Sequence, residues 1–118
     1  MGFNQQNGEV VTWPFGDASV APLTTSGDQV VDVANNMTIV DGASVAASGD
    51  RTLNLTLASV LGAGARLVLK HKATATEKLT LGEGIKGVEI TGVAGKTIVA
   101  EFIYDGTAFL QVSKNQID

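Results

Sequence analysis

The stretch that decides the fold runs from Lys96 to Ser113 and reads KTIVAEFIY-DG-TAFLQVS. Its two halves are rich in β-branched and aromatic residues, which favour strands. They flank Asp105-Gly106, a pair that tolerates the positive φ angles of a type I′ turn. The pattern predicts an antiparallel hairpin with a two-residue loop, in which Phe102 lies opposite Phe109.

Both faces of this hairpin are largely apolar. One face is expected to carry Ile98, Ala100, Phe102, Tyr104 and Phe109, and the other Val99, Ile103, Ala108, Leu110 and Val112, broken only by Glu101. A hairpin in an isolated two-layer sandwich normally has one wet face. This hairpin is therefore expected to be central and covered twice, or to pack against another subunit. The residues expected at such a subunit contact are Ile98, Phe102, Phe109, Leu110 and Val112.

Shorter strands are expected upstream of the hairpin. Thr52 to Leu57 alternates polar residues with leucines, which is the period of a half-buried strand. No segment carries a 3.6-residue apolar period through three turns, so helices are not expected. The sequence predicts one all-β domain. Further strands are expected at Gln29 to Val33, Met37 to Val40, Gly87 to Thr91, and Arg66 to His71 paired with Lys78 to Leu81 as a hairpin.

Residues 1–27 differ from the rest of the chain. They contain both prolines and the single tryptophan, and they lack sustained alternation. They are expected to form an extended N-terminal arm before a β-sandwich domain at residues 28–118; a frayed or irregular edge segment is an equal alternative. Trp13 and Phe15 would be costly to leave in water, so they are expected to anchor the arm.

Charge is divided unevenly along the chain. Residues 1–50 hold six acids and no Lys or Arg, whereas residues 51–96 hold seven bases and three acids. This division fits solvated surface charge of mixed sign, or an acidic N-terminal segment that lies on a basic body of the same chain or a neighbouring subunit. Nucleic-acid binding is not expected, because the bases are scattered and no aromatics lie among them.

Other features of the sequence exclude thiol chemistry and argue against a membrane partner. The chain has no cysteine, which removes disulfides and thiolate chemistry. Its N-terminus lacks the features of a secretory signal, and no stretch approaches the roughly 20 apolar residues of a membrane span. We expect a protein made in soluble form, with no membrane partner.

The sequence offers no constellation typical of an enzyme. Gly82 to Gly87 matches G-x-G-x-x-G, but the residues that follow resemble a strand rather than a phosphate-binding helix, so turn glycines are expected. His71 is the single histidine and lies between Lys70 and Lys72, which predicts a surface position. The carboxylates are spread one per turn or strand. No catalytic residue, cofactor or metal site is expected.

The C-terminal third carries a family resemblance. Leu79 to Gly82, Gly92 to Gly95 and Phe102 to Val112 (FIYDGTAFLQV) follow Leu53 to Leu57 and Gly62 to Leu69. Over roughly residues 50–113 the chain resembles β-domains of bacteriophage virion proteins, of the head-fibre, tail-fibre or capsid-decoration kind. The resemblance implies an antiparallel, jelly-roll-like β-sandwich that is commonly trimeric, and it brings no catalytic residues.

The resemblance also implies a location and partners. The chain would be made in the host cytoplasm and reside in the virion as a homotrimer, with the N-terminal arm fastened to a capsid or tail protein. A host-surface glycan is a further candidate partner. The competing class is a carbohydrate- or ligand-binding β-sandwich of non-viral origin, in which aromatic side chains form platforms for sugar rings.

Overall fold

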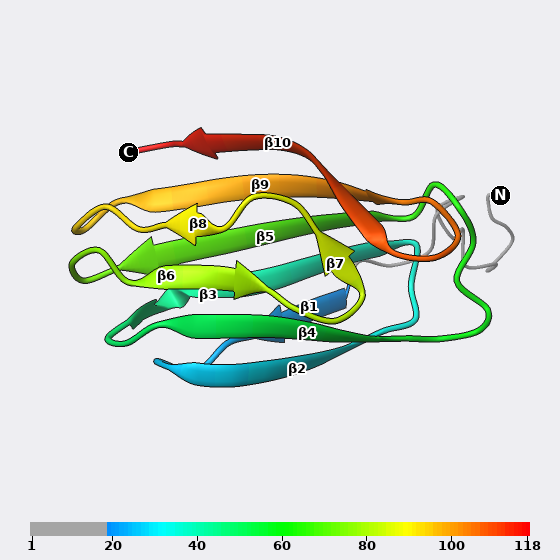
Figure 1. Ribbon diagram of the computed structural model, residues 1–118, viewed down its shortest axis with the longest axis horizontal. Helices are drawn as coiled ribbons and strands as arrows, with labels where there is room; N and C mark the ends of the chain where they lie inside the picture. Colours follow the sequence, from blue (N-terminus) through cyan, green and yellow to red (C-terminus); the bar gives the residue numbers. More distant parts are fainter. Residues whose placement is uncertain (1–18) are drawn as a thin grey trace, which may run out of the picture.

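The computed structural model describes residues 19–118, which form ten strands and no helix. The prediction of an all-β fold is confirmed. The strands make two sheets that face each other (Figure 1). The six-stranded sheet has the order β1 (Ser19–Pro22), β3 (Met37–Ala47), β5 (Arg66–Ala73), β9 (Thr97–Tyr104), β10 (Phe109–Gln116), β7 (Ile85–Lys86). The four-stranded sheet has the order β2 (Gly27–Val33), β4 (Arg51–Leu57), β6 (Lys78–Leu81), β8 (Ile90–Thr91).

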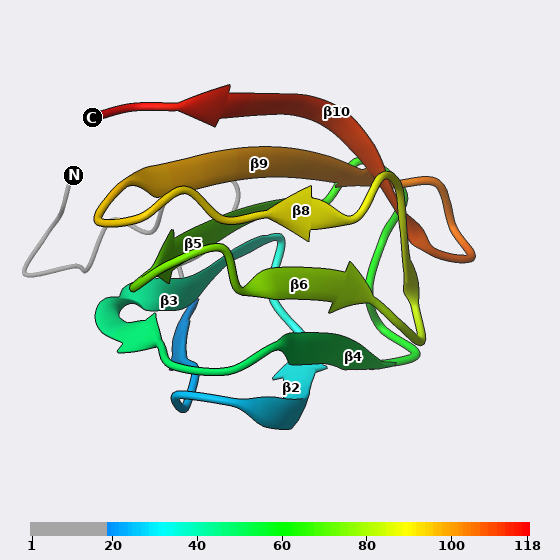
Figure 2. The same ribbon diagram turned by 60° about the vertical axis from the view of Figure 1, so that its left-hand side comes forward.

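The first six strands wind as a coil. They alternate between the two sheets, and each strand from β3 to β6 pairs in parallel with the strand two places before it (Figure 2). Strand β7 also pairs in parallel, with β10. The expected antiparallel pairing is therefore wrong for these five pairs and holds for β5–β9, β9–β10 and β6–β8. Alternation in a sequence predicts which side chains are buried, but it does not identify a strand's partner or direction.

The predicted hairpin between residues 66–71 and 78–81 is wrong for the same reason. Strand β5 lies in the six-stranded sheet and β6 in the four-stranded sheet. Residues 74–77 carry the chain from one sheet to the other. Each of these two strands has one apolar side. That side can be buried in the core from either sheet, so the sequence pattern does not show that the two strands pair with each other.

The C-terminal hairpin is confirmed, with a longer loop than predicted. Tyr104 lies opposite Phe109, so the loop is Asp105 to Ala108 rather than two residues. The Asp105 carboxylate accepts hydrogen bonds from the N–H groups of Ala108 (2.9 Å) and Thr107 (2.8 Å), and these bonds lower the pKa of Asp105. The register differs from the prediction by two residues. Because side chains alternate with period two, the predicted sharing of faces holds for Tyr104 with Phe109 and for Ile103 with Leu110. It fails for Ala108, which is buried in the loop, and for Val112, which lies at a register shift.

The core lies between the sheets. The hairpin face that carries Phe102, Tyr104 and Phe109 is buried there, inside a single chain, whereas Phe102 and Phe109 were expected at a subunit contact. These rings meet leucines, valines and isoleucines from both sheets. Fully buried members of this core are Val33, Val40, Leu53, Leu67, Leu69, Leu79, Ile85, Ile90, Phe102 and Phe109.

The expected arm at residues 1–27 overlaps the sheets. Ser19–Pro22 forms β1, which pairs with β3, and β2 begins at Gly27. Residues 1–18 of the expected arm lie outside the described residues. The predicted anchors Trp13 and Phe15 lie outside the described residues.

Candidate functional site

The outward side of the six-stranded sheet is rich in apolar side chains. Register places Val20 beside Ile39 and Ile39 beside Val68 on this side, and Ile103 beside Leu110. Val20 is exposed and the others are half-buried. All described strands belong to the two sheets, so none of them lies over this side. We call this set the apolar outer face: Val20, Met37, Ile39, Val68, Val99, Ile103 and Leu110.

Charged residues are interspersed on the apolar outer face. Arg66 lies between Met37 and Ile103 in the register, and Glu101 lies beside Val68. Both Arg66 and Glu101 are exposed. Neither takes part in an ion pair among the described residues. Further charged residues lie on the same outward side: Lys70 lies between Asp41 and Val99 in the register, and Lys86 lies beside Leu110. The face thus carries apolar and charged side chains in the same rows, and a partner would have to match or desolvate the charges.

The outward side of the four-stranded sheet is polar. Register places Thr52 between Asp28 and Thr80, and it places Lys78 beside Thr91. Val30 is the apolar exception on this side. We call this set the polar outer face: Asp28, Asp32, Thr52, Asn54, Thr56, Lys78, Thr80 and Thr91.

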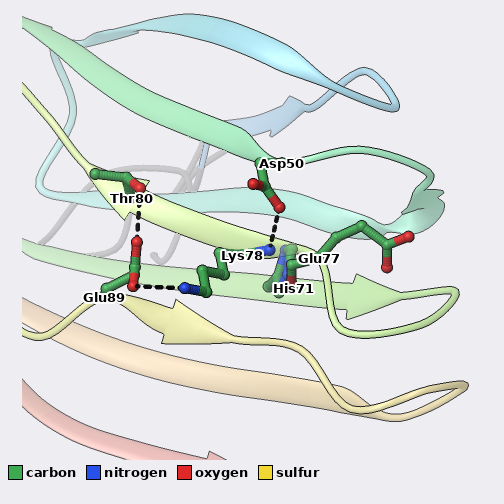
Figure 3. Close-up of polar contacts among 6 residues, drawn as sticks. All are labelled: Asp50, His71, Glu77, Lys78, Thr80 and Glu89. Carbon is green, nitrogen blue, oxygen red and sulfur yellow. Dashed lines mark hydrogen bonds and ion pairs between the residues drawn. The ribbon is translucent and has the colours of Figure 1, made fainter.

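Polar contacts link the strands of the polar outer face (Figure 3). Lys78 Nζ lies 3.8 Å from Glu89 Oε1, and the Thr80 hydroxyl donates to Glu89 Oε2 at 3.1 Å. The Lys78 N–H donates to Asp50 Oδ1 at 2.9 Å. An exposed ion pair of this kind contributes about 0–1 kcal/mol, so these contacts orient side chains more than they stabilise the fold.

The residues predicted at a subunit contact fall into two groups. Ile98, Phe102 and Phe109 are core residues of the single chain, with 6%, 0% and 0% of their surface exposed. Leu110 is half-buried on the apolar outer face, and Val112 is exposed beside an irregularity in the β9–β10 register. Only these last two can meet a partner without opening the core.

A buried arginine joins three chain segments. Arg51 is 1% exposed, and its guanidinium donates hydrogen bonds to the carbonyl oxygens of Thr24 (2.9 Å), Gly42 (2.9 Å) and Val45. Burial lowers the pKa of Arg51, while the charges of nearby carboxylates oppose that shift. The three carbonyl dipoles take the place of water around the guanidinium. Arg51 thereby holds the irregular end of β3 against β4 and the β1–β2 turn.

His71 belongs to the same buried centre, so its predicted surface position is wrong. It is 0% exposed, and its Nε2 lies 2.8 Å from the carbonyl oxygen of Glu77 while its Nδ1 lies 3.4 Å from Arg51 Nη1. A carbonyl accepts and a guanidinium donates, so the neutral ring with hydrogen on Nε2 satisfies both contacts. Burial lowers the pKa of His71. Both side chains are therefore enclosed by the protein.

The strand pattern contained a signal for both buried residues. Arg51 shares its side of β4 with Leu53 and Leu55, and His71 shares its side of β5 with Leu67 and Leu69. Extending each alternation by one step would have placed them in the core. The flanking lysines of His71 hid this signal, because they point to the other side of the strand.

The glycine-rich segment at residues 82–87 is a turn, as predicted. No helix follows it: β7 begins at Ile85, within the motif. The Gly82 N–H donates to the Leu53 carbonyl at 2.7 Å, and the Gly84 carbonyl accepts from the Phe109 N–H at 2.9 Å. These bonds attach the segment to β4 and β10.

The described part of the chain holds no group of three or more His, Asp or Glu side chains suited to a metal ion. Within residues 19–118, no helix is long and apolar enough to cross a membrane. No protein-family model, curated protein or solved structure matches the chain. The apolar outer face is the candidate functional site.

Proposed function

We propose that this chain is a non-catalytic structural module that assembles with copies of itself through the apolar outer face. The observation that carries the proposal is the contrast between that face and the polar outer face. Apolar side chains on five neighbouring strands gain free energy when they leave water, by about 25 cal/mol for each Å². A contiguous exposed apolar patch is typical of a protein contact.

The size of the sheet is compatible with such a contact. Strands β3, β5, β9 and β10 each have at least eight residues. With strands about 4.8 Å apart and about 3.3 Å per residue, these four strands span on the order of 500 Å². A stable interface buries about 800 Å² on each partner. The face with its margins can therefore supply the larger part of one interface.

The more specific proposal follows the resemblance to bacteriophage virion β-domains. In it, the module forms a homotrimer in a head fibre, tail fibre or capsid decoration, and residues before β1 attach it to a capsid or tail protein. The sandwich form is supported by two facing sheets. The jelly-roll-like form has less support, because jelly rolls use antiparallel Greek keys whereas β1 to β6 form a parallel coil.

The alternative, a carbohydrate-binding sandwich, lacks an aromatic platform in the described residues. Phe102, Tyr104 and Phe109 are at most 8% exposed. No other aromatic residue occurs after Ser19. A glycan array tests this alternative directly, and specific sugar binding by the purified chain would favour it over a purely structural role.

The oligomeric state tests the proposal. Size exclusion with light scattering, run over a wide range of concentration, should give a mass that is a whole multiple of the chain mass, three for a trimer. A single-chain mass at the highest concentration would overturn assembly through this face.

A further inference from the structure

The two ends of the sandwich differ in regularity. Where β3 ends and β4 begins, the β3–β5 register shifts between Gly42 and Ala47, and residues 43–46 are half-buried or exposed. Ile103, near the end of β9 where the chain turns into β10, is still paired on both sides. These places lie at opposite ends of β5 and β9 (Figure 1). We call them the arginine end (residues 23–27, 42–51, 71–77 and 92–95) and the hairpin end (residues 34–37, 58–66 and 102–109).

Two cationic side chains are enclosed inside the arginine end. Arg51 donates to three backbone carbonyls there, among them that of Gly42 at 2.9 Å. A Cβ at Gly42 would lie 2.6 Å from Arg51 Nη1, and a Cβ at Gly92 would lie 3.3 Å from His71 Nε2. Glycine at both places lets the backbone approach Arg51 and His71 closely.

The contact between His71 and Arg51 requires a neutral imidazole ring. Nε2 donates to the Glu77 carbonyl at 2.8 Å, and Nδ1 accepts from Arg51 Nη1 at 3.4 Å. A protonated ring carries hydrogen on both nitrogens. Its Nδ1–H would then face an N–H of Arg51, and two positive charges would lie side by side in a buried site. Protonation therefore converts an attractive contact into a repulsive one.

The other groups around His71 do not cancel this repulsion. The carboxylates of Asp50 and Glu77 favour a charged ring, but they accept hydrogen bonds from backbone N–H and hydroxyl groups instead (Figure 3). The neighbours in register, Gly42 on β3 and Ile98 on β9, carry no charge. The two lysines that flank His71 point to the outward side of β5. Burial is the largest influence, and it lowers the pKa of His71.

The backbone of the arginine end is where this repulsion can be relieved. His71 lies on β5, which is paired on both sides in the six-stranded sheet. The carbonyls that Arg51 binds belong instead to the β1–β2 turn and to the irregular end of β3. Native proteins open locally where the backbone is irregular and exposed. If Arg51 moves away from a protonated ring, all three carbonyls lose their donors together.

We infer that His71 and Arg51 form an acid-sensitive switch, in which protonation of His71 opens the arginine end while the hairpin end stays closed. Opening separates residues 23–27 and 42–50 from the rest of the sandwich. It uncovers Leu23 and Ala47, which are 3% and 0% exposed in the closed form. The switch lies inside one chain, so it does not depend on the proposed assembly.

Amide exchange of the full-length chain, measured by NMR between about pH 7.5 and 4.5, tests the inference. Each exchange rate is divided by the intrinsic rate at the same pH. The open form binds one more proton below a pH of about 6.5, so opening of the arginine end should increase about tenfold for each pH unit. The amides that report on the arginine end are Leu23, Gly27, Ser48, Thr74 and Gly92, each bonded to a carbonyl.

The hairpin end supplies the matched control in the same sample. Its reporter amides are Gly64, Arg66, Tyr104 and Phe109, which are also bonded to carbonyls. At about pH 5 they should remain at least about tenfold better protected than the arginine end. A low concentration of urea should speed exchange at the hairpin end only, because local opening exposes little new surface.

His71 gives a second readout, because it is the single histidine and its ring signals need no variant for assignment. The ring should titrate below its ordinary value, and His71→Gln should abolish the pH dependence at the arginine end. A ring that titrates at or above a pH of about 6.5 would overturn the inference. So would equal protection and equal urea dependence at both ends, which indicate global unfolding, or a pH dependence that survives in His71→Gln. The parent chain decides the first two outcomes even if His71→Gln does not fold.

Discussion

The two outer faces of this molecule are built on the same kind of strand and differ in what they present. Along the six-stranded sheet, Val20, Ile39 and Val68 lie side by side, and the next row contains Asp41, Lys70 and Val99. A row of the four-stranded sheet is Asp28, Thr52 and Thr80. Both sheets bury their other side in one shared core. Alternation of apolar and polar residues therefore explains the buried sides of the two sheets. It does not explain why their outer sides differ in polarity. We propose assembly through the apolar outer face as the reason for that difference.

The largest expected effect is a loss of stability when the buried Arg51 between the two sheets is replaced. Arg51→Met removes the donors of three buried carbonyl hydrogen bonds, and unfolding measured in urea should show a loss of about 3–5 kcal/mol. The matched control is Lys96→Met, since Lys96 is exposed and lies outside both outer faces. It should change stability by about 0.5 kcal/mol or less. Equal losses for the two variants would contradict the role of the buried guanidinium.

Acid should destabilise the fold through His71, which is buried beside Arg51. Burial lowers the pKa of His71 in the folded chain below its ordinary value of about 6.5. The unfolded chain then binds more protons, so stability should fall as the pH drops below about 6.5 and should be constant in this respect above it. Urea midpoints measured between pH 8 and 5 would show this fall. His71→Gln should flatten the curve in this window, and an equally steep curve would assign the effect to other groups.

Replacing the charged residue at the centre of the apolar outer face should strengthen self-association. Glu101 is exposed beside Val68, and a partner must desolvate its carboxylate. Glu101→Leu should strengthen self-association by about tenfold, equivalent to about 1.4 kcal/mol. Thr80→Leu makes a similar change on the polar outer face and should leave association unchanged. Analytical ultracentrifugation measures the self-association of both variants. A larger increase for Thr80→Leu than for Glu101→Leu would contradict assembly through the apolar outer face.

The smallest effect is expected on the polar outer face. Asn54 Oδ1 accepts a hydrogen bond from the Glu83 N–H at 3.0 Å, which attaches the glycine turn to β4. Asn54→Ala should cost about 1 kcal/mol in urea unfolding without changing the oligomeric mass. A change in mass would show that this face also takes part in assembly.

Local patterns predicted much of the fold. The strand over Lys78–Leu81 and the strands near residues 51–57, 66–73 and 97–104 follow from alternation. The C-terminal hairpin follows from Asp105-Gly106, because its two strands are adjacent in sequence. The parallel coil could not be predicted in this way. Its partners are 19 to 29 residues apart, as in Ser19 with Thr38 and Thr38 with Leu67, and no turn motif connects them.

The candidate site was predicted only in part. The expectation of two apolar hairpin faces put Leu110, Val99 and Ile103 on one side, and the structure places them together on the outward side of the six-stranded sheet. It also assigned Phe102 and Phe109 to a subunit contact, although the second sheet covers them. The hairpin sequence shows that both of its sides are apolar, but it does not show which of them the second sheet covers. That depends on residues in distant strands, such as Leu53 and Leu79.

The most direct test of the central claim is one pair of lysine substitutions measured by sedimentation velocity. Val68→Lys places a charge in the middle of the apolar outer face, and Thr52→Lys places the same charge on the polar outer face. The account predicts that the parent chain and Thr52→Lys sediment as the same oligomer, while Val68→Lys sediments as a folded single chain. An unchanged oligomer in Val68→Lys, or its loss in Thr52→Lys alone, would contradict the account.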